Sequence, residues 1–168
     1  MAVFAQYDYL FAVGTIFAFL DAWNIGANDV ANSWASSVSS RSLSYVQAML
    51  GASVMEFTGA LGVGGRVADT IRTKIVDVEA FNDSPALLML GMVCAVIASA
   101  SYLTMATRLG FPVSTTHSIL GGVLGMGVGA LGGSGITWVG YKDDGSVNIQ
   151  DGVVQVSTQT LSLTLSTH

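Results

Sequence analysis

Two polar segments interrupt an otherwise apolar chain. The first, DAWNIGANDVANS at residues 21–33, holds two aspartates and three asparagines. The second, PVSTTHS at residues 112–118, places four hydroxyl side chains and a histidine within seven positions. Carboxylate and amide oxygens are ligands that hard cations prefer, whereas unpaired backbone N–H groups at a helix start bind anions. The two segments therefore predict a cation site and an anion site.

The first segment places its polar residues on one side of a helix. Gly26 lies in its middle and favours a helix break, which would free backbone carbonyls as further cation ligands. A charge at the bilayer centre costs about 2.5–3.5 kcal/mol, so it faces a partner or an aqueous cavity. We favour ion binding for Asp29 and leave ion binding and interhelical contact both open for Asn32. On an unbroken helix the polar stripe consists of Asp21, Asn24, Asn28 and Asn32, with Asp29 beside it.

Glu56 is a further acid inside an apolar stretch, which we expect to span the bilayer over residues 43–63. One interpretation is a protonated, hydrogen-bonded carboxyl group that only packs. We favour a role in cation or proton binding, because intramembrane acids mark ion pathways.

The hydroxyl-rich segment is predicted to begin a half-helix. Arg108 and Gly110 break the preceding apolar run, and Pro112 suits the first position of a helix, where its missing N–H is no loss. Free backbone N–H groups and the positive end of the helix dipole would then meet an anion at membrane depth. Ordinary N-capping is the alternative, but it accounts for a single hydroxyl. The predicted anion contacts are Ser114, Thr115 and Thr116.

The histidine beside these hydroxyls does not indicate an enzyme. A hydrolytic triad needs a general base brought from elsewhere in the fold, and the strained nucleophile-elbow motif is absent from the sequence. We interpret His117 as a packing or supporting residue.

Composition places these segments in a membrane protein. The chain has 168 residues, of which 51% are hydrophobic and 10% charged, and its mean hydropathy is +0.60. Soluble domains carry about 25% charged residues. The net charge of -5 argues against a nucleic-acid partner, which requires a basic face. We predict an all-α, polytopic fold with spans at residues 9–20 continuing through the first polar segment, 43–63, 86–107 and a glycine-rich run at 119–139.

Glycines recur every fourth residue in the last predicted span, at positions 121, 125, 129 and 133. This small-xxx-small pattern lets membrane helices approach closely. A moving partner helix and static packing explain it equally well. Because each glycine weakens a helix by up to about 1 kcal/mol, we expect this helix to bend or to end early.

The two polar segments resemble a known pair of signatures. GANDVANS (26–33) and PVSTTHS (112–118) resemble those of the inorganic phosphate transporter (PiT) family of sodium- or proton-coupled phosphate symporters. The longer stretches DAWNIGANDVANS, SSRSL and VMEFTGALGVGGRVADTIR are most similar to fungal sodium–phosphate symporters. The resemblance implies two inverted repeats with broken helices, each carrying both signatures, around a phosphate site near the bilayer midplane.

The resemblance also implies roles for individual residues. Asp21 lies outside the common motif, and its role stays open. Phosphate would be bound by Ser114, Thr115 and Thr116. Coupling cations would be bound or supported by Asn28, Asp29, Asn32 and Glu56, with sodium at Asn28, Asp29 and Glu56.

Each signature occurs once in this chain. We therefore expect residues 1–156 to form the N-terminal repeat, with about four to five membrane segments, and residues 157–168 to form a divergent Ser/Thr-rich tail. Because one repeat would supply only half of the phosphate site, we expect the chain to be inactive unless a homodimer or a second repeat completes the site. The expected partners are phosphate, sodium and the lipid bilayer, with no cofactor, and the expected location is the plasma membrane. The alternative is a non-transporting fragment that modulates a full-length transporter.

Cation coupling follows from charge. Moving an anion inward against an inside-negative potential costs about 2.3 kcal/mol per charge per 100 mV. Two sodium ions would cancel the charge of a phosphate dianion. The motifs leave sodium and proton coupling both open, because Asp29 and Glu56 suit either ion.

Overall fold

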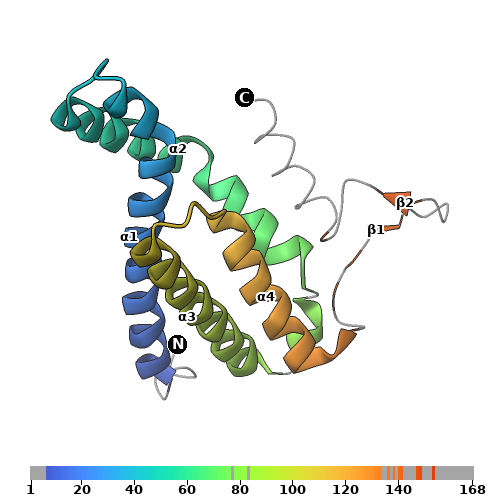
Figure 1. Cartoon of the computed structure of the whole chain (residues 1–168). Helices are drawn as coiled ribbons and strands as arrows, with labels where there is room; N and C mark the ends of the chain where they lie inside the picture. Colours follow the sequence, from blue (N-terminus) through green and yellow to red (C-terminus); the bar gives the residue numbers. More distant parts are fainter. Residues whose placement is uncertain are drawn as a thin grey trace.

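Within the part of the chain that the structure describes, the fold consists of four α-helices, a short 3₁₀ helix and a hairpin of two short strands (Figure 1). The computed structural model describes residues 7–76, 78–82, 84–133, 136, 138, 140–141, 147–148 and 153. The elements are α1 (Asp8–Ser39), α2 (Tyr45–Lys74), η2 (Glu79–Phe81), α3 (Pro85–Leu109), α4 (Thr115–Leu131), β1 (Gly140–Tyr141) and β2 (Val147–Asn148). The strands pair antiparallel with Gly140 opposite Asn148. The predicted all-helical class is confirmed, and the expected tail at 157–168 lies outside the described residues.

Three of these helices are long and apolar enough to cross a membrane: α1, residues 45–66 of α2, and α3. Most of their apolar side chains are exposed, as expected for helices that face lipid, and Phe11, Phe19 and Leu61 are examples. The fourth helix, α4, is apolar but only 17 residues long. The chain is therefore a multi-pass membrane protein.

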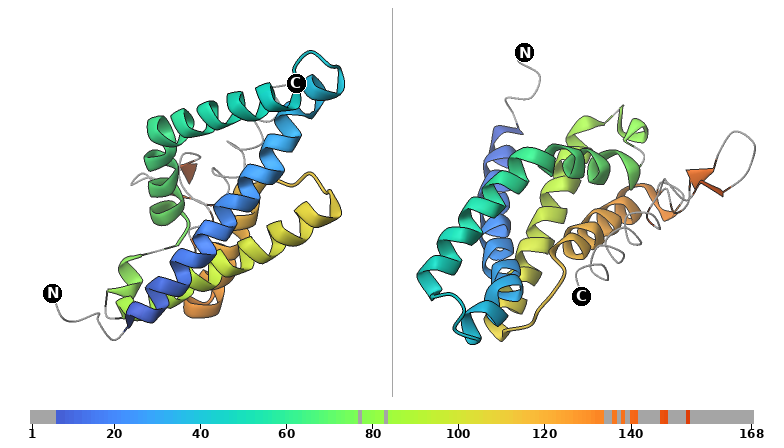
Figure 2. Two further views of the ribbon diagram at one scale, coloured as in Figure 1. Left: turned by 90° about the vertical axis from the view of Figure 1, so that its left-hand side faces the viewer. Right: turned by 90° about the horizontal axis from the view of Figure 1, so that it is seen from above.

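The helix α1 lies beside α3, and α4 turns back along the opposite side of α3 (Figures 1 and 2). The buried face of α3 is rich in small residues, including Ala95, Ser99 and Ala100, which allows close approach of its neighbours. The buried positions of α1 are all polar: Asp21, Asn24 and Asn28. The α1–α3 interface is thus polar at the points where α1 is most buried.

The predicted break at Gly26 is wrong, because α1 runs unbroken for 32 residues. Asn24 and Asn28 bond to α3 on either side of this glycine. Such anchoring outweighs the roughly 1 kcal/mol by which one glycine weakens a helix. The polar stripe predicted for an unbroken helix is confirmed at its buried positions.

The chain breaks instead between α3 and α4. Gly110 ends α3 in the left-handed conformation, with φ of 72°, which a residue without Cβ adopts at little cost. Ser114 caps α4 by accepting a hydrogen bond from the His117 N–H at 3.4 Å. The half-helix start is confirmed, but the placement of Pro112 as its first residue is wrong. The cap falls two residues after the proline, so Thr115 is the first helical residue.

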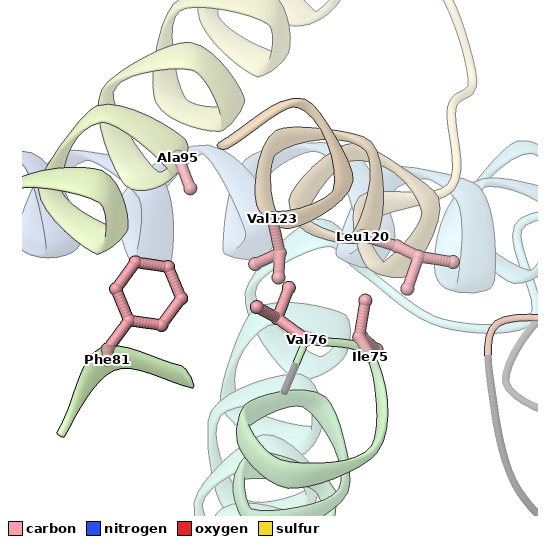
Figure 3. Close-up of a cluster of buried hydrophobic side chains, with 6 residues drawn as sticks. All are labelled: Ile75, Val76, Phe81, Ala95, Leu120 and Val123. Atoms are coloured by element: carbon pink, nitrogen blue, oxygen red, sulfur yellow. The ribbon is translucent and has the colours of Figure 1, made fainter. Parts of the chain in front are cut away.

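The helix α2 bends along its length (Figure 2), and its middle carries four glycines at positions 59, 62, 64 and 65. Its end and η2 then meet α3 and α4 in an apolar core (Figure 3). The core holds α2, η2 and the α3–α4 pair together. Its buried members are Ile75, Val76, Phe81, Ala95, Leu120 and Val123.

The glycines of α4 fall into two classes. A Cβ placed on Gly122 would lie 2.7 Å from the Ala95 carbonyl oxygen, so this glycine permits the contact with α3. A Cβ on any of the regularly spaced glycines at 121, 125, 129 and 133 would meet nothing within 4 Å. The predicted early end is confirmed, since α4 stops at Leu131. The stripe therefore does not serve packing among the described residues.

Candidate functional site

The site begins with the contact that fixes α1 on α3. The Asn24 Nδ2 group donates to Thr104 Oγ1 at 2.7 Å and to the Ala100 carbonyl at 3.4 Å. Thr104 in turn donates to the same carbonyl at 2.7 Å. These bonds set the register of the two helices and so position the residues one turn further along α1.

Asn28 holds the linker between α3 and α4. Its Nδ2 group donates to the Phe111 carbonyl at 3.0 Å and to Thr107 Oγ1 at 3.4 Å. Its Oδ1 atom accepts from the Val113 N–H at 3.2 Å and from Asn32 Nδ2 at 3.1 Å. Both polar ends of the side chain are thus occupied. In this arrangement Asn28 positions the helix break rather than presenting a free oxygen to a cation.

Asp29 joins the first polar segment to the second. Its Oδ2 atom accepts a hydrogen bond from Thr115 Oγ1 at 3.0 Å. The Asp29 side chain is half-buried, and this bond ties the predicted cation segment to the predicted anion segment.

Asn32 and Glu56 are less enclosed than the sequence suggested. Asn32 is exposed, and its side chain donates to Asn28. Glu56 is exposed, like every residue of α2 from 53 to 63. Two of the predicted cation residues bond to the hydroxyl segment: Asn28 accepts from the Val113 backbone N–H, and Asp29 accepts from the Thr115 hydroxyl.

A cavity of about 520 Å³ opens beside the first turn of α4. Ser114 enters its wall together with His117, whose Nδ1 atom lies 2.6 Å from Ser114 Oγ. The first backbone N–H groups of a helix lack intrahelical partners, and the dipole is positive there. The lining combines hydroxyl, imidazole and small apolar groups, and consists of Ala98, Tyr102, Val113, Ser114, His117, Ser118, Gly121 and Gly122.

The structure divides the three predicted anion contacts. Ser114 lines the cavity, Thr115 turns to Asp29, and Thr116 is half-buried and does not line the cavity. His117 was predicted to be a packing or supporting residue, and its contact with Ser114 in the cavity wall agrees with a supporting role. Ser118 was not predicted, although it belongs to the same motif.

Most of the chain matches known transporters. A family model described as the Phosphate transporter family matches residues 25–166. The chain is 68% identical over 154 residues to the phosphate-repressible phosphate permease pho-4 of Neurospora crassa, covering 92% of this chain and 25% of that relative. It is 44% identical over 133 residues to a sodium-dependent phosphate transporter of Toxoplasma gondii, covering 79% of this chain and 15% of that relative.

A solved structure agrees with the fold. The protein described as the sodium-dependent phosphate transporter superposes with a TM-score of 0.73 at 44% identity, covering 77% of this chain and 32% of the solved one. The chain thus spans a quarter or less of the two relatives and about a third of the solved protein.

Proposed function

Because the chain belongs to the phosphate transporter family, we propose that it takes part in moving inorganic phosphate across a membrane by sodium symport. In this proposal residues 1–156 form the N-terminal repeat of a transporter, and a second set of both signatures completes the site. The hydrogen bond between Asp29 and Thr115 is the observation that carries the proposal, because it connects the cation segment to the anion segment.

The mechanism uses both the oxygen and the proton of the Thr115 hydroxyl group. In the described arrangement Thr115 donates its proton to Asp29. A sodium ion bound by the Asp29 carboxylate attracts the Thr115 oxygen as a further ligand, which releases the O–H to donate to phosphate. Sodium occupancy then raises phosphate affinity, and by linkage phosphate raises sodium affinity equally.

Phosphate binds at the start of α4. Ser114 and the free N–H groups of the first turn replace the water that an oxyanion loses on entering the site. His117 orients the Ser114 hydroxyl through its 2.6 Å contact. Glu56 supports the cation bound at Asp29, and Asn28 keeps the linker between α3 and α4 in place.

The proposal is tested by uptake of radioactive phosphate into liposomes that carry a sodium gradient. We expect no uptake by this chain alone and sodium-dependent uptake when a second repeat completes the site. Asp29→Asn then abolishes uptake, whereas Asp8→Asn, at an exposed acid in the first turn of α1, leaves it intact. Proton-driven uptake without sodium would overturn the coupling, and uptake by Asp29→Asn would overturn the mechanism.

A second candidate function is that of a non-transporting subunit that binds and modulates a full-length transporter. The observation in its favour is the glycine stripe of α4, which faces open space at positions 121, 125 and 129. Such a stripe admits a second helix at close range. Co-purification with a tagged full-length transporter, lost on Gly125→Leu, supports this function, and failure to co-purify rules it out.

A further inference from the structure

Asp21 is a buried acid that the proposed site does not use. It is only 9% exposed and lies in the middle of α1, on the same stripe as Asn24 and Asn28. Those two asparagines bond to α3, whereas the Asp21 Oδ1 atom is buried and has no hydrogen-bond partner among the described residues. A carboxylate oxygen left without a partner inside a membrane span requires an explanation.

The groups around Asp21 come from two other helices. The Ser99 hydroxyl of α3, 1% exposed, lies beside the Asp21 carboxylate. Ser99 Oγ is in turn 3.1 Å from Ser118 Oγ of α4. Ser99 of α3 therefore links the Asp21 carboxylate of α1 to the Ser118 hydroxyl of α4. All of these groups are oxygens, which are the ligands of hard cations.

One member of this cluster borders a cavity. Ser118 lines the cavity of about 520 Å³ whose wall also includes Ser114 and His117. Its hydroxyl oxygen contacts that of Ser99, which neighbours Asp21. The cluster therefore lies next to the space into which the anion is proposed to bind, while Asp21 and Ser99 themselves are buried.

We propose that Asp21, Ser99 and Ser118 form a sodium site separate from the one at Asp29. The two aspartates are eight residues apart, which corresponds to about 12 Å along α1. The unpartnered Oδ1 atom supplies one ligand, and the hydroxyl oxygens supply two more. A sodium ion there would neutralise the charged form of the Asp21 carboxylate in the interior of the fold. That this sodium ion is the second charge that balances a phosphate dianion rests on the proposed function. The sodium site itself does not depend on that function.

The test is the number of radioactive sodium ions bound per chain, measured on the purified protein in lipid nanodiscs. Asp21→Asn keeps the shape of the side chain and removes the charge. We expect it to lower the stoichiometry by one ion, both in the wild-type background and in the Asp29→Asn background. Asp8→Asn, at an exposed acid, is the matched control and leaves the stoichiometry unchanged.

Two further measurements separate a ligand from a merely structural residue. Ser99→Ala keeps the carboxylate and removes one oxygen ligand, so it weakens sodium binding at this site by about fivefold. Sodium raises the thermal stability of the wild-type chain, since an ion that binds only the folded state stabilises it. Asp21→Asn reduces that rise. Its unfolding in sodium-free choline buffer shows whether the variant folds.

Unchanged stoichiometry and an unchanged sodium-dependent rise in the melting temperature of a folded Asp21→Asn variant would overturn the site. Stability that is indifferent to sodium and falls as pH rises would assign a proton to Asp21 and would also overturn it. Loss of one sodium ion in Asp21→Asn, together with failure of phosphate uptake in every assembly, would support this site and refute the proposed function.

Discussion

The bonds of Asn28 predict how much this residue stabilises the helix break. Its side chain makes four hydrogen bonds, and two of them satisfy backbone groups of the linker at Phe111 and Val113. Polar contacts in membrane proteins average about 0.6 kcal/mol each, so four amount to about 2.4 kcal/mol. Leaving the two backbone groups unpaired adds to this value. We expect Asn28→Ala to lower the free energy of unfolding by about 2–4 kcal/mol.

The measurement is unfolding in mixed micelles, followed by circular dichroism, together with hydrogen exchange at the Val113 amide. Asn32→Ala is the matched control, because Asn32 is exposed and contributes one of the same four bonds. It should cost about 0.6 kcal/mol. The Val113 amide should exchange faster in Asn28→Ala only, since Asn28 accepts its proton.

Sodium decides between a structural and a ligand role for Asn28. If the residue holds the linker, the loss in Asn28→Ala is the same in sodium-free choline buffer and in sodium. A loss that appears only in sodium would show that Asn28 acts as a cation ligand and would refute the reasoning from its four bonds. A loss no larger than that of Asn32→Ala would refute it as well.

Three more predictions concern the elements around the site, and each uses the same unfolding measurement. Gly122→Ala should destabilise the chain, because its Cβ would lie 2.7 Å from the Ala95 carbonyl oxygen. Gly125→Ala is the control: its Cβ would meet nothing within 4 Å, so it should stabilise the chain by up to about 1 kcal/mol. Equal effects of the two changes would contradict the close contact between Gly122 and α3. Ser114→Ala should lower the free energy of unfolding by about 1 kcal/mol through loss of the cap, and Ser114→Gly by only a few tenths. Ser114→Gly should still weaken phosphate binding, measured by equilibrium dialysis. Normal phosphate binding by Ser114→Gly would show that the Ser114 hydroxyl does not belong to the anion site. Gly110→Ala should cost about 1–2 kcal/mol, because φ is 72° there; a neutral result would show that the break does not need this conformation.

The sequence predicted those features that depend on local spacing. The stripe of α1 follows from helical periodicity, the break after α3 from Gly110 and its neighbours, and the early end of α4 from its glycines. The same local reasoning failed at Gly26, because bonds from Asn24 and Asn28 to α3 stabilise the straight helix. Helix propensity contains no information about partners on another helix.

The contacts within the site could not be predicted from local sequence patterns either, because they join different helices. Asp29 and Thr115 are 86 residues apart, so their bond exists only once α1 and α4 have packed around α3. Nothing in the sequence singles out Ser99, one of two serines in its apolar span, as the neighbour of Asp21. The sequence also could not indicate that the Asn28 oxygen is already occupied by two donors.

The distance in sequence between the polar face of α1 and its partners has a consequence for biogenesis. The groups that receive the Asn24 side chain lie 76 and 80 residues further along the chain. At a synthesis rate of about 5–20 residues per second, α1 emerges from the ribosome roughly 4–16 s before those groups exist. During that interval lipid offers its amides and its buried acid no hydrogen-bond partner. We therefore expect the polar face of α1 to be satisfied only after α3 has been synthesised, so that a change in α3 that prevents these bonds also destabilises α1.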